Sequence, residues 1–117
     1  MPFRFEDLHV WQKALDLDDS INKLTKSFPK DEILVLTSQI KRAADSVVLN
    51  IAEGSTGQTK PVFKQFLGYA LRSAIEVVSC LFIAKKRNYI KDETFKQLYE
   101  DYEQLVKMIT NLRNSLN

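Results

Sequence analysis

Apolar residues recur at spacings of three and four through almost the whole chain. Each helical residue advances the chain by about 100°, so this spacing places them on one helical face. The four segments run from about Glu6 to Phe28, about Lys30 to Glu53, Pro61 to about Arg87, and Asp92 onward. No strand-like alternation interrupts them. The sequence therefore predicts an all-α fold, an antiparallel up-down-up-down four-helix bundle, as one domain over residues 1–117.

Each segment supplies one apolar line to the expected core. In the second segment the line is Ile33, Leu36, Ile40, Ala43, Val47 and Ile51. In the third it is Phe63, Phe66, Ala70, Ala74, Val77, Leu81 and Ala84. Further apolar residues lie on second faces of the first and third segments, namely Leu8, Trp11, Leu71, Val78 and Phe82. Because a bundle buries one seam per helix, we expect these second faces to contact another subunit.

Three residues mark expected segment ends. Gly54 is expected to close the second helix in the left-handed conformation that glycine adopts easily. Pro61 suits the first turn of the third helix, where a missing N–H costs nothing. Asp92 is the predicted N-cap of the fourth helix, because its carboxylate can accept a free backbone N–H there.

Charge is unevenly distributed over the 117 residues, although the net charge is only +2. Residues 57–91 contain seven cations and one anion, and the rest of the chain has an excess of four anions. No run of 18 apolar residues is present, and charges occupy the positions where a signal peptide would be apolar. We therefore expect a cytoplasmic protein with no membrane span and no membrane partner.

The cations suggest a surface for phosphate groups, which would bind nucleic acid without sequence preference and with a strong salt dependence. The candidate contacts are Arg42, Lys60, Lys64, Arg72, Lys85, Lys86 and Arg87. The alternative is ordinary solvated charge. For Lys85, Lys86 and Arg87, stabilisation of a helix C-terminus is a further alternative, because cations are favourable there. Lys60 and Lys64 lie at the opposite helix end, where that explanation fails.

A line of polar residues follows the second helix at spacings of three and four. It comprises Gln39, Arg42, Ser46, Asn50 and Glu53 within an arc of roughly 80°. Three interpretations are open: a solvent face, a ligand site with Arg42 as the anion contact, and an assembly network. In a network, Arg42 would pair with Glu53 or Glu76 and Asn50 would bond across helices.

Catalytic and metal-binding patterns are weak. His9 is the single histidine, and Cys80 has no basic activator nearby in sequence. Asp16, Asp18 and Asp19 resemble a metal cluster only superficially, because Asp16 and Asp18 point to different sides of a helix. The GSTGQTK segment lacks the spacing of a phosphate-binding loop. We expect no enzymatic activity, no metal and no cofactor.

Several ordered motifs carry a family resemblance. They are FEDLHVWQKA, FP followed by Asp31 and Glu32, QIKRAADSVVLNIAEG, KQFLGYALRSAIEV and NYI. Together they resemble the bacterial four-helix-bundle family encoded in intervening sequences of 23S ribosomal RNA, which is similar to the accessory protein of diversity-generating retroelements. The resemblance implies a homopentameric ring, a role in binding nucleic acid and no enzymatic activity. The family often has glycine before the serine of the third helix, where this chain has Arg72.

The expected function is that of a non-catalytic homo-oligomer, most simply a pentamer, whose basic third helix contacts RNA or DNA. The alternative is an oligomeric scaffold that binds a protein partner and makes no contact with nucleic acid.

Overall fold

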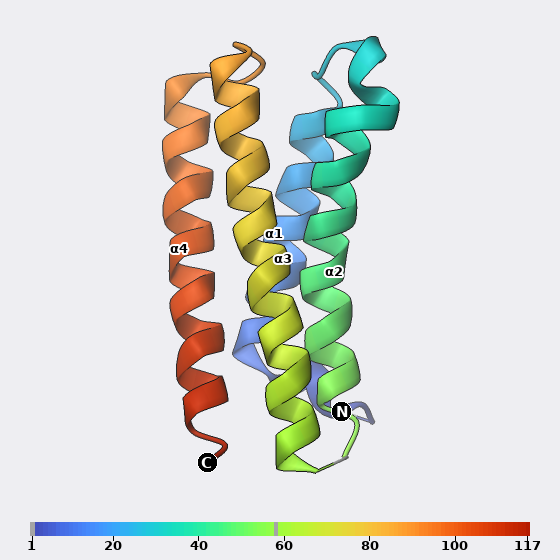
Figure 1. Ribbon diagram of the computed structural model, residues 1–117, viewed down its shortest axis with the longest axis vertical. Helices are drawn as coiled ribbons and strands as arrows, with labels where there is room; N and C mark the ends of the chain where they lie inside the picture. The colour runs from blue at the N-terminus through green and yellow to red at the C-terminus, as the bar shows by residue number, and fades with distance from the viewer. Residues whose placement is uncertain (1, 58) are drawn as a thin grey trace.

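Four long helices lie side by side in the computed structural model, which describes residues 2–57 and 59–117 (Figure 1). The helical elements in chain order are η1 (Arg4–Asp7), α1 (His9–Thr25), η2 (Lys30–Glu32), η3 (Ile33–Thr37), α2 (Ser38–Gly54), α3 (Lys60–Lys86) and α4 (Asp92–Asn114). The described residues contain no strand. Successive long helices run in opposite directions, so the predicted antiparallel four-helix bundle is confirmed.

The four long helices occupy the corners of a bundle 43 Å long and 22 Å across in each direction. Helix α1 packs against α2 and α4, and α3 packs against the same two helices, so α1 and α3 are diagonal. The core runs along the axis. The largest aliphatic side chains with no exposed surface are Ile21, Ile40, Ile51, Leu67, Leu81, Leu105 and Ile109. Leu67 replaces Phe66 in the predicted line, since Phe66 is only half-buried.

Helix α3 is the most apolar of the long helices. By length and composition alone it could cross a membrane, because an 18-residue stretch reaches a mean hydropathy of 1.6. Its inner face, which includes Phe63 and Val77, lies in the bundle core. The core helix of a soluble protein has the same composition, so one such helix is weak evidence for a membrane span.

The first helix is shorter than its periodicity predicted. Leu8 is extended, with φ −82° and ψ 119°, and separates the 3₁₀ helix η1 from α1. In η1 the Glu6 carboxylate accepts the backbone N–H of Phe3 at 3.2 Å. At the other end α1 stops at Thr25, and tight turns then carry the chain to the buried Phe28.

The second segment is not a regular α-helix before Ser38. Residues 30–32 form a 3₁₀ turn, and residues 33–37 form a π-helix, whose wider turn changes the face on which side chains emerge. Ile33 was predicted to be buried but is exposed, as are its neighbours Leu34 and Val35. Leu36 is buried as predicted. The bundle therefore presents three consecutive apolar residues at one end, with Leu34 89% exposed.

Gly54 does not have the predicted left-handed conformation. It is the last residue of α2, it is buried, and positive φ among glycines occurs instead at Gly57, at 88°. Its role is close packing: a Cβ on Gly54 would lie 2.7 Å from Phe66 Cβ and 2.9 Å from Phe63 Cδ1. The absence of a side chain therefore lets α2 and α3 approach at this end.

The start of α3 is as predicted, whereas the start of α4 is not. Pro61 lies in the first turn of α3, where the N-cap Thr59 accepts the Val62 N–H at 3.4 Å. Asn88 turns the chain after α3 with φ 61°. Asp92 is not the N-cap of α4, because the extended Lys91 has that position. As the first helical residue, Asp92 instead places its charge near the positive end of the helix dipole.

Candidate functional site

The polar line of α2 forms one wall of a groove between α2 and α3. The groove is lined by Arg42, Ala43, Asp45, Ser46, Leu49, Asn50, Glu53, Ser73 and Glu76. Four of the five residues in the predicted line are therefore brought together with Glu76. The fifth, Gln39, donates from Nε2 to Glu76 Oε2 at 3.5 Å, which links the two helices weakly.

A hydrogen-bonded chain crosses this groove through Ser46. The Asn50 amide donates from Nδ2 to the backbone oxygen and the hydroxyl of Ser46, at 2.8 and 2.9 Å. The Ser73 hydroxyl on α3 donates to the same Ser46 hydroxyl at 2.9 Å. All three side chains are half-buried, so water could not fully replace these hydrogen bonds if they were broken. The helix-to-helix bond is therefore made by Ser46 and not, as predicted, by Asn50.

Arg42 does not make the predicted pairings. Within residues 2–57 and 59–117, no ion pair joins Arg42 to Glu53 or Glu76. Arg42 and Glu53 are both exposed at the groove, where they remain available to a second molecule.

Replacing Asn50 by leucine is expected to lower the free energy of unfolding by about 0.5–1.5 kcal/mol, because two hydrogen bonds to Ser46 are lost. Urea denaturation measures this change, and light scattering measures any change in assembly. Asn111→Leu is the control, since Asn111 is exposed on α4. If Asn50→Leu alters neither stability nor mass, the groove is an ordinary solvent face.

The predicted basic residues of α3 lie near its two ends, with Arg72 between them. Lys60 and Lys64 are in the first two turns, and Lys85, Lys86 and Arg87 are at the C-terminal end. At a rise of 1.5 Å per residue, the two groups are roughly 30 Å apart. Within the described part of the chain, Lys60 and Lys86 make no hydrogen bond or ion pair, so their ammonium groups are free.

The other α3 cations have partners inside the subunit. Lys64 Nζ donates to Asn117 Oδ1, which ties the start of α3 to the end of the chain. The Lys85 ammonium lies 4.4 Å from the centre of the Phe95 ring, and the Arg72 guanidinium lies 5.9 Å from that of Tyr69. Such cation–π contacts leave the charge exposed to solvent, so they do not prevent contact with an anion.

Arg87 has a structural role that the sequence did not reveal. Its Nη1 lies 2.9 Å from Glu32 Oε2, and the Tyr89 hydroxyl donates to the same oxygen at 2.7 Å. The Tyr89 hydrogen bond and the Arg87 charge hold the pKa of Glu32 below its ordinary value. Arg87 therefore joins the end of α3 to η2, and its charge is already partly neutralised.

Apolar side chains share the outer face of α3 with the cations. Ile75 is 56% exposed and Phe82 is 51% exposed, and both lie within roughly 80° of Lys64, Arg72 and Lys86 around the helix. The other second-face residues, Leu8, Trp11, Leu71 and Val78, are half-buried against the core. The sequence did not single out Ile75. The outer face thus carries exposed apolar side chains together with cations at both ends and at Arg72.

Chemically reactive groups are sparse in the described structure. Burial raises the pKa of the Cys80 thiol, which disfavours the nucleophilic thiolate. His9 is exposed at the start of α1. Among the described residues, no group of three or more histidine, cysteine or acidic side chains is arranged to hold a metal ion. The two surfaces that remain as candidate sites are the α2–α3 groove and the outer face of α3.

Comparison with known proteins identifies relatives of unknown function. The family model for the 23S rRNA-intervening sequence protein matches residues 6–111. A crystal structure from Bacteroides thetaiotaomicron, of a protein with unknown function from the S23 ribosomal protein family, superposes with a TM-score of 0.83. That protein is 25% identical, and the match covers 90% of this chain and 95% of the other. No curated protein matches. Since the family model spans most of the bundle, the chain belongs to the family of 23S rRNA-intervening sequence proteins.

Proposed function

We propose that this protein is a non-catalytic homo-oligomer, with a pentamer as the expected assembly, that binds nucleic acid without sequence preference. The observation that carries the proposal is the outer face of α3, where exposed Ile75 and Phe82 lie between two groups of cations. A second copy of the chain would cover these two apolar side chains. The free ammonium groups of Lys60 and Lys86 would then remain at opposite rims.

Phosphate contact suits the chemistry of these rims. Lysine ammonium groups on flexible stems bind phosphates as point charges and read no base edges, so the affinity would be independent of sequence. Repetition of each rim around an oligomer would add contacts and raise the avidity. Exposed Arg42 in the α2–α3 groove is a further cation available to such a ligand.

Binding of labelled mixed-sequence RNA, measured by fluorescence anisotropy, tests the proposal. Affinity is expected to fall steeply between about 50 and 200 mM salt. The double variant Lys60→Glu, Lys86→Glu is expected to weaken binding about tenfold or more at low salt. The slope of log affinity against log salt concentration is expected to decrease by the amount that about two phosphate contacts contribute. Lys107→Glu is the control, because Lys107 is an exposed lysine on α4. No binding at low salt, or an equal loss in the control, would contradict nucleic-acid binding by α3.

Light scattering tests the assembly separately. The wild-type mass is expected to be five times that of the 13.5 kDa chain, and Ile75→Glu is expected to reduce it. Gln104→Glu, an exposed change on α4, is expected to leave the mass unchanged. A monomeric wild-type protein would contradict the assembly part of the proposal and leave the binding test valid.

A protein-binding scaffold is the second candidate, and the exposed residues Ile33, Leu34 and Val35 favour it. Three consecutive exposed apolar side chains on a π-helical turn are unusual for a surface that meets only water. This candidate predicts no affinity for RNA at any salt concentration, so the anisotropy measurement distinguishes the two functions.

A further inference from the structure

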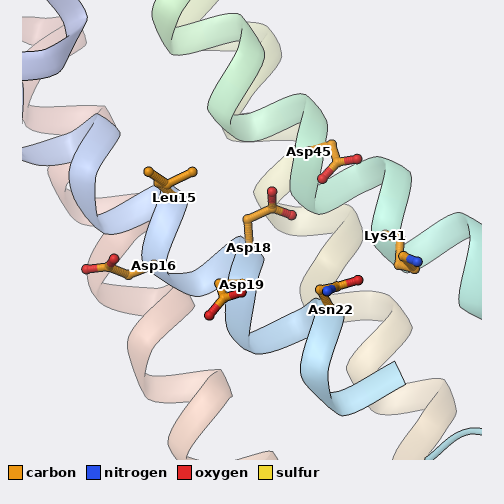
Figure 2. A pocket seen from close by; sticks show the side chains of 7 residues that line it. All are labelled: Leu15, Asp16, Asp18, Asp19, Asn22, Lys41 and Asp45. Atoms are coloured by element: carbon orange, nitrogen blue, oxygen red, sulfur yellow. The ribbon is translucent and has the colours of Figure 1, made fainter. Parts of the chain in front are cut away.

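A cleft between α1 and α2 carries most of its charge as carboxylates (Figure 2). It is lined by Leu15, Asp16, Asp18, Asp19, Asn22, Lys41 and Asp45. Figure 2 shows the Asp18 side chain of α1 and the Asp45 side chain of α2 directed toward one another, while Asp16 points away. The three neighbouring acids of α1 therefore do not act together, and Asp18 alone meets an acid from another helix.

The carboxyl groups of half-buried Asp18 and exposed Asp45 face each other, and they can share a hydrogen bond when one of them is protonated. An ionised carboxylate only accepts hydrogen bonds, so two ionised carboxylates cannot bond to each other. A bond between them therefore requires a proton on the pair, and the burial of Asp18 favours its protonated form. A hydrogen bond between α1 and α2 at this point exists only while the pair carries a proton, and repulsion replaces it when both groups are ionised.

The charged groups around the pair have opposite effects on its ionisation. From α1, Asp19 adds a like charge, although it also pairs with Lys23 at 3.0 Å. From α2, Lys41 is the opposing cation. From α4, the buried Tyr102 faces the pair, and its own pKa is raised by burial and by the charges of Asp18 and Asp45. Tyr102 therefore contributes a neutral phenol.

These surroundings hold a proton on the pair to near-neutral pH. Burial raises the pKa of Asp18 most, and the hydrogen bond to Asp45 and the charges of Asp45 and Asp19 raise it further, to about 7. Lys41 opposes the shift. Carboxyl pairs that share a site commonly behave in this way, because both cannot ionise without repulsion.

We propose that Asp18 and Asp45 form a pH-sensitive contact that holds α1 against α2 when they share a proton and repels it when both are ionised. The cleft lies between α1 and α2, and α1 is diagonal to α3, although Asp45 also borders the α2–α3 groove that contains Arg42. The pH response of the pair involves none of the α3 cations. The pair gives the bundle a response to pH changes around neutrality that ordinary aspartates, which titrate near pH 4, cannot give.

The direction of the pH effect follows from the proton balance. In the unfolded chain Asp18 loses its proton near its ordinary pKa of 3.8, whereas the folded protein retains it to about pH 7. Between these values the folded state binds more protons, so this pair makes stability fall as the pH rises. The favourable contribution is complete below the unfolded pKa and is lost above about pH 7.

Thermal unfolding between pH 5 and 9 tests the proposal with Asp45→Asn. The asparagine amide can donate to ionised Asp18 without adding a second charge. Near pH 5 the variant is expected to melt close to the wild type, and near pH 8.5 several degrees higher, on the order of 5 °C. Asp16→Asn, which removes a charge from the same cleft outside the pair, is expected to follow the wild-type profile. Parallel profiles for wild type and Asp45→Asn would overturn the proposal.

A direct titration of the wild-type protein decides the matter if the variant does not fold. The carboxyl carbon of Asp18, followed by ¹³C NMR against pH, is expected to shift with a midpoint near 7. A midpoint near its ordinary value of 3.8 would overturn the proposal, because the pair would then be fully ionised at neutral pH.

Discussion

Gly54→Ala is expected to lower the free energy of unfolding by about 1–3 kcal/mol, although alanine is the better helix former. The added Cβ would lie 2.7 Å from Phe66 Cβ and 2.9 Å from Phe63 Cδ1. The first of these atoms is bonded to the backbone of α3 and cannot swing away. The two helices must therefore separate, which loosens the core at this end of the bundle.

The control is Gly68→Ala, because Gly68 lies on the outer side of α3. A Cβ there would lie 3.5 Å from the Arg113 guanidinium, which is ordinary contact with a flexible side chain. This variant is expected to gain about 0.5–1 kcal/mol from helix propensity. Urea denaturation of both variants measures the difference. Similar gains in the two would show that α2 and α3 do not need a glycine at residue 54.

Leu67→Ala is expected to cost about 2–5 kcal/mol in unfolding free energy, the largest effect of the proposed substitutions. Leu67 has no exposed surface, and its removal would leave a cavity in the bundle core. The close-packed side chains around it in the core cluster can relax only partly.

Leu49→Ala provides the matched exchange on the surface. Leu49 is 60% exposed on α2, so the change is expected to stay within about 0.5 kcal/mol in the isolated subunit. Denaturation at low protein concentration keeps the effect of assembly out of the comparison. If the two variants lose equal stability, Leu67 does not lie in a tightly packed core.

The fold could be predicted from sequence because helical periodicity is a local property. One apolar line per segment was enough to give four helices and their order. The errors occurred where neighbouring residues compete for the seam: Phe66 and Leu67 are about 100° apart, and the line alone does not decide which is buried. At Ile33 the local π turn rotates the face, and no apolar spacing signals such a turn.

The candidate sites could be predicted only in part, since contacts between helices depend on their register. The spacing along α2 identified Ser46 and Asn50, but not Ser73, which meets them from another helix. Asp18 was assessed with its sequence neighbours, whereas its partner Asp45 lies on α2. Arg87 was assigned to a phosphate surface because Glu32, 55 residues away, could not be recognised as its partner.

The buried thiol of Cys80 gives this chain a built-in reporter of its own opening. It is the single cysteine, it is 2% exposed, and it lies on the inner face of α3. A thiol reagent can reach it only when α3 separates from its neighbours. The labelling rate therefore measures how often the bundle opens, without an introduced probe, and it can be compared directly among the variants at residues 45, 54 and 67.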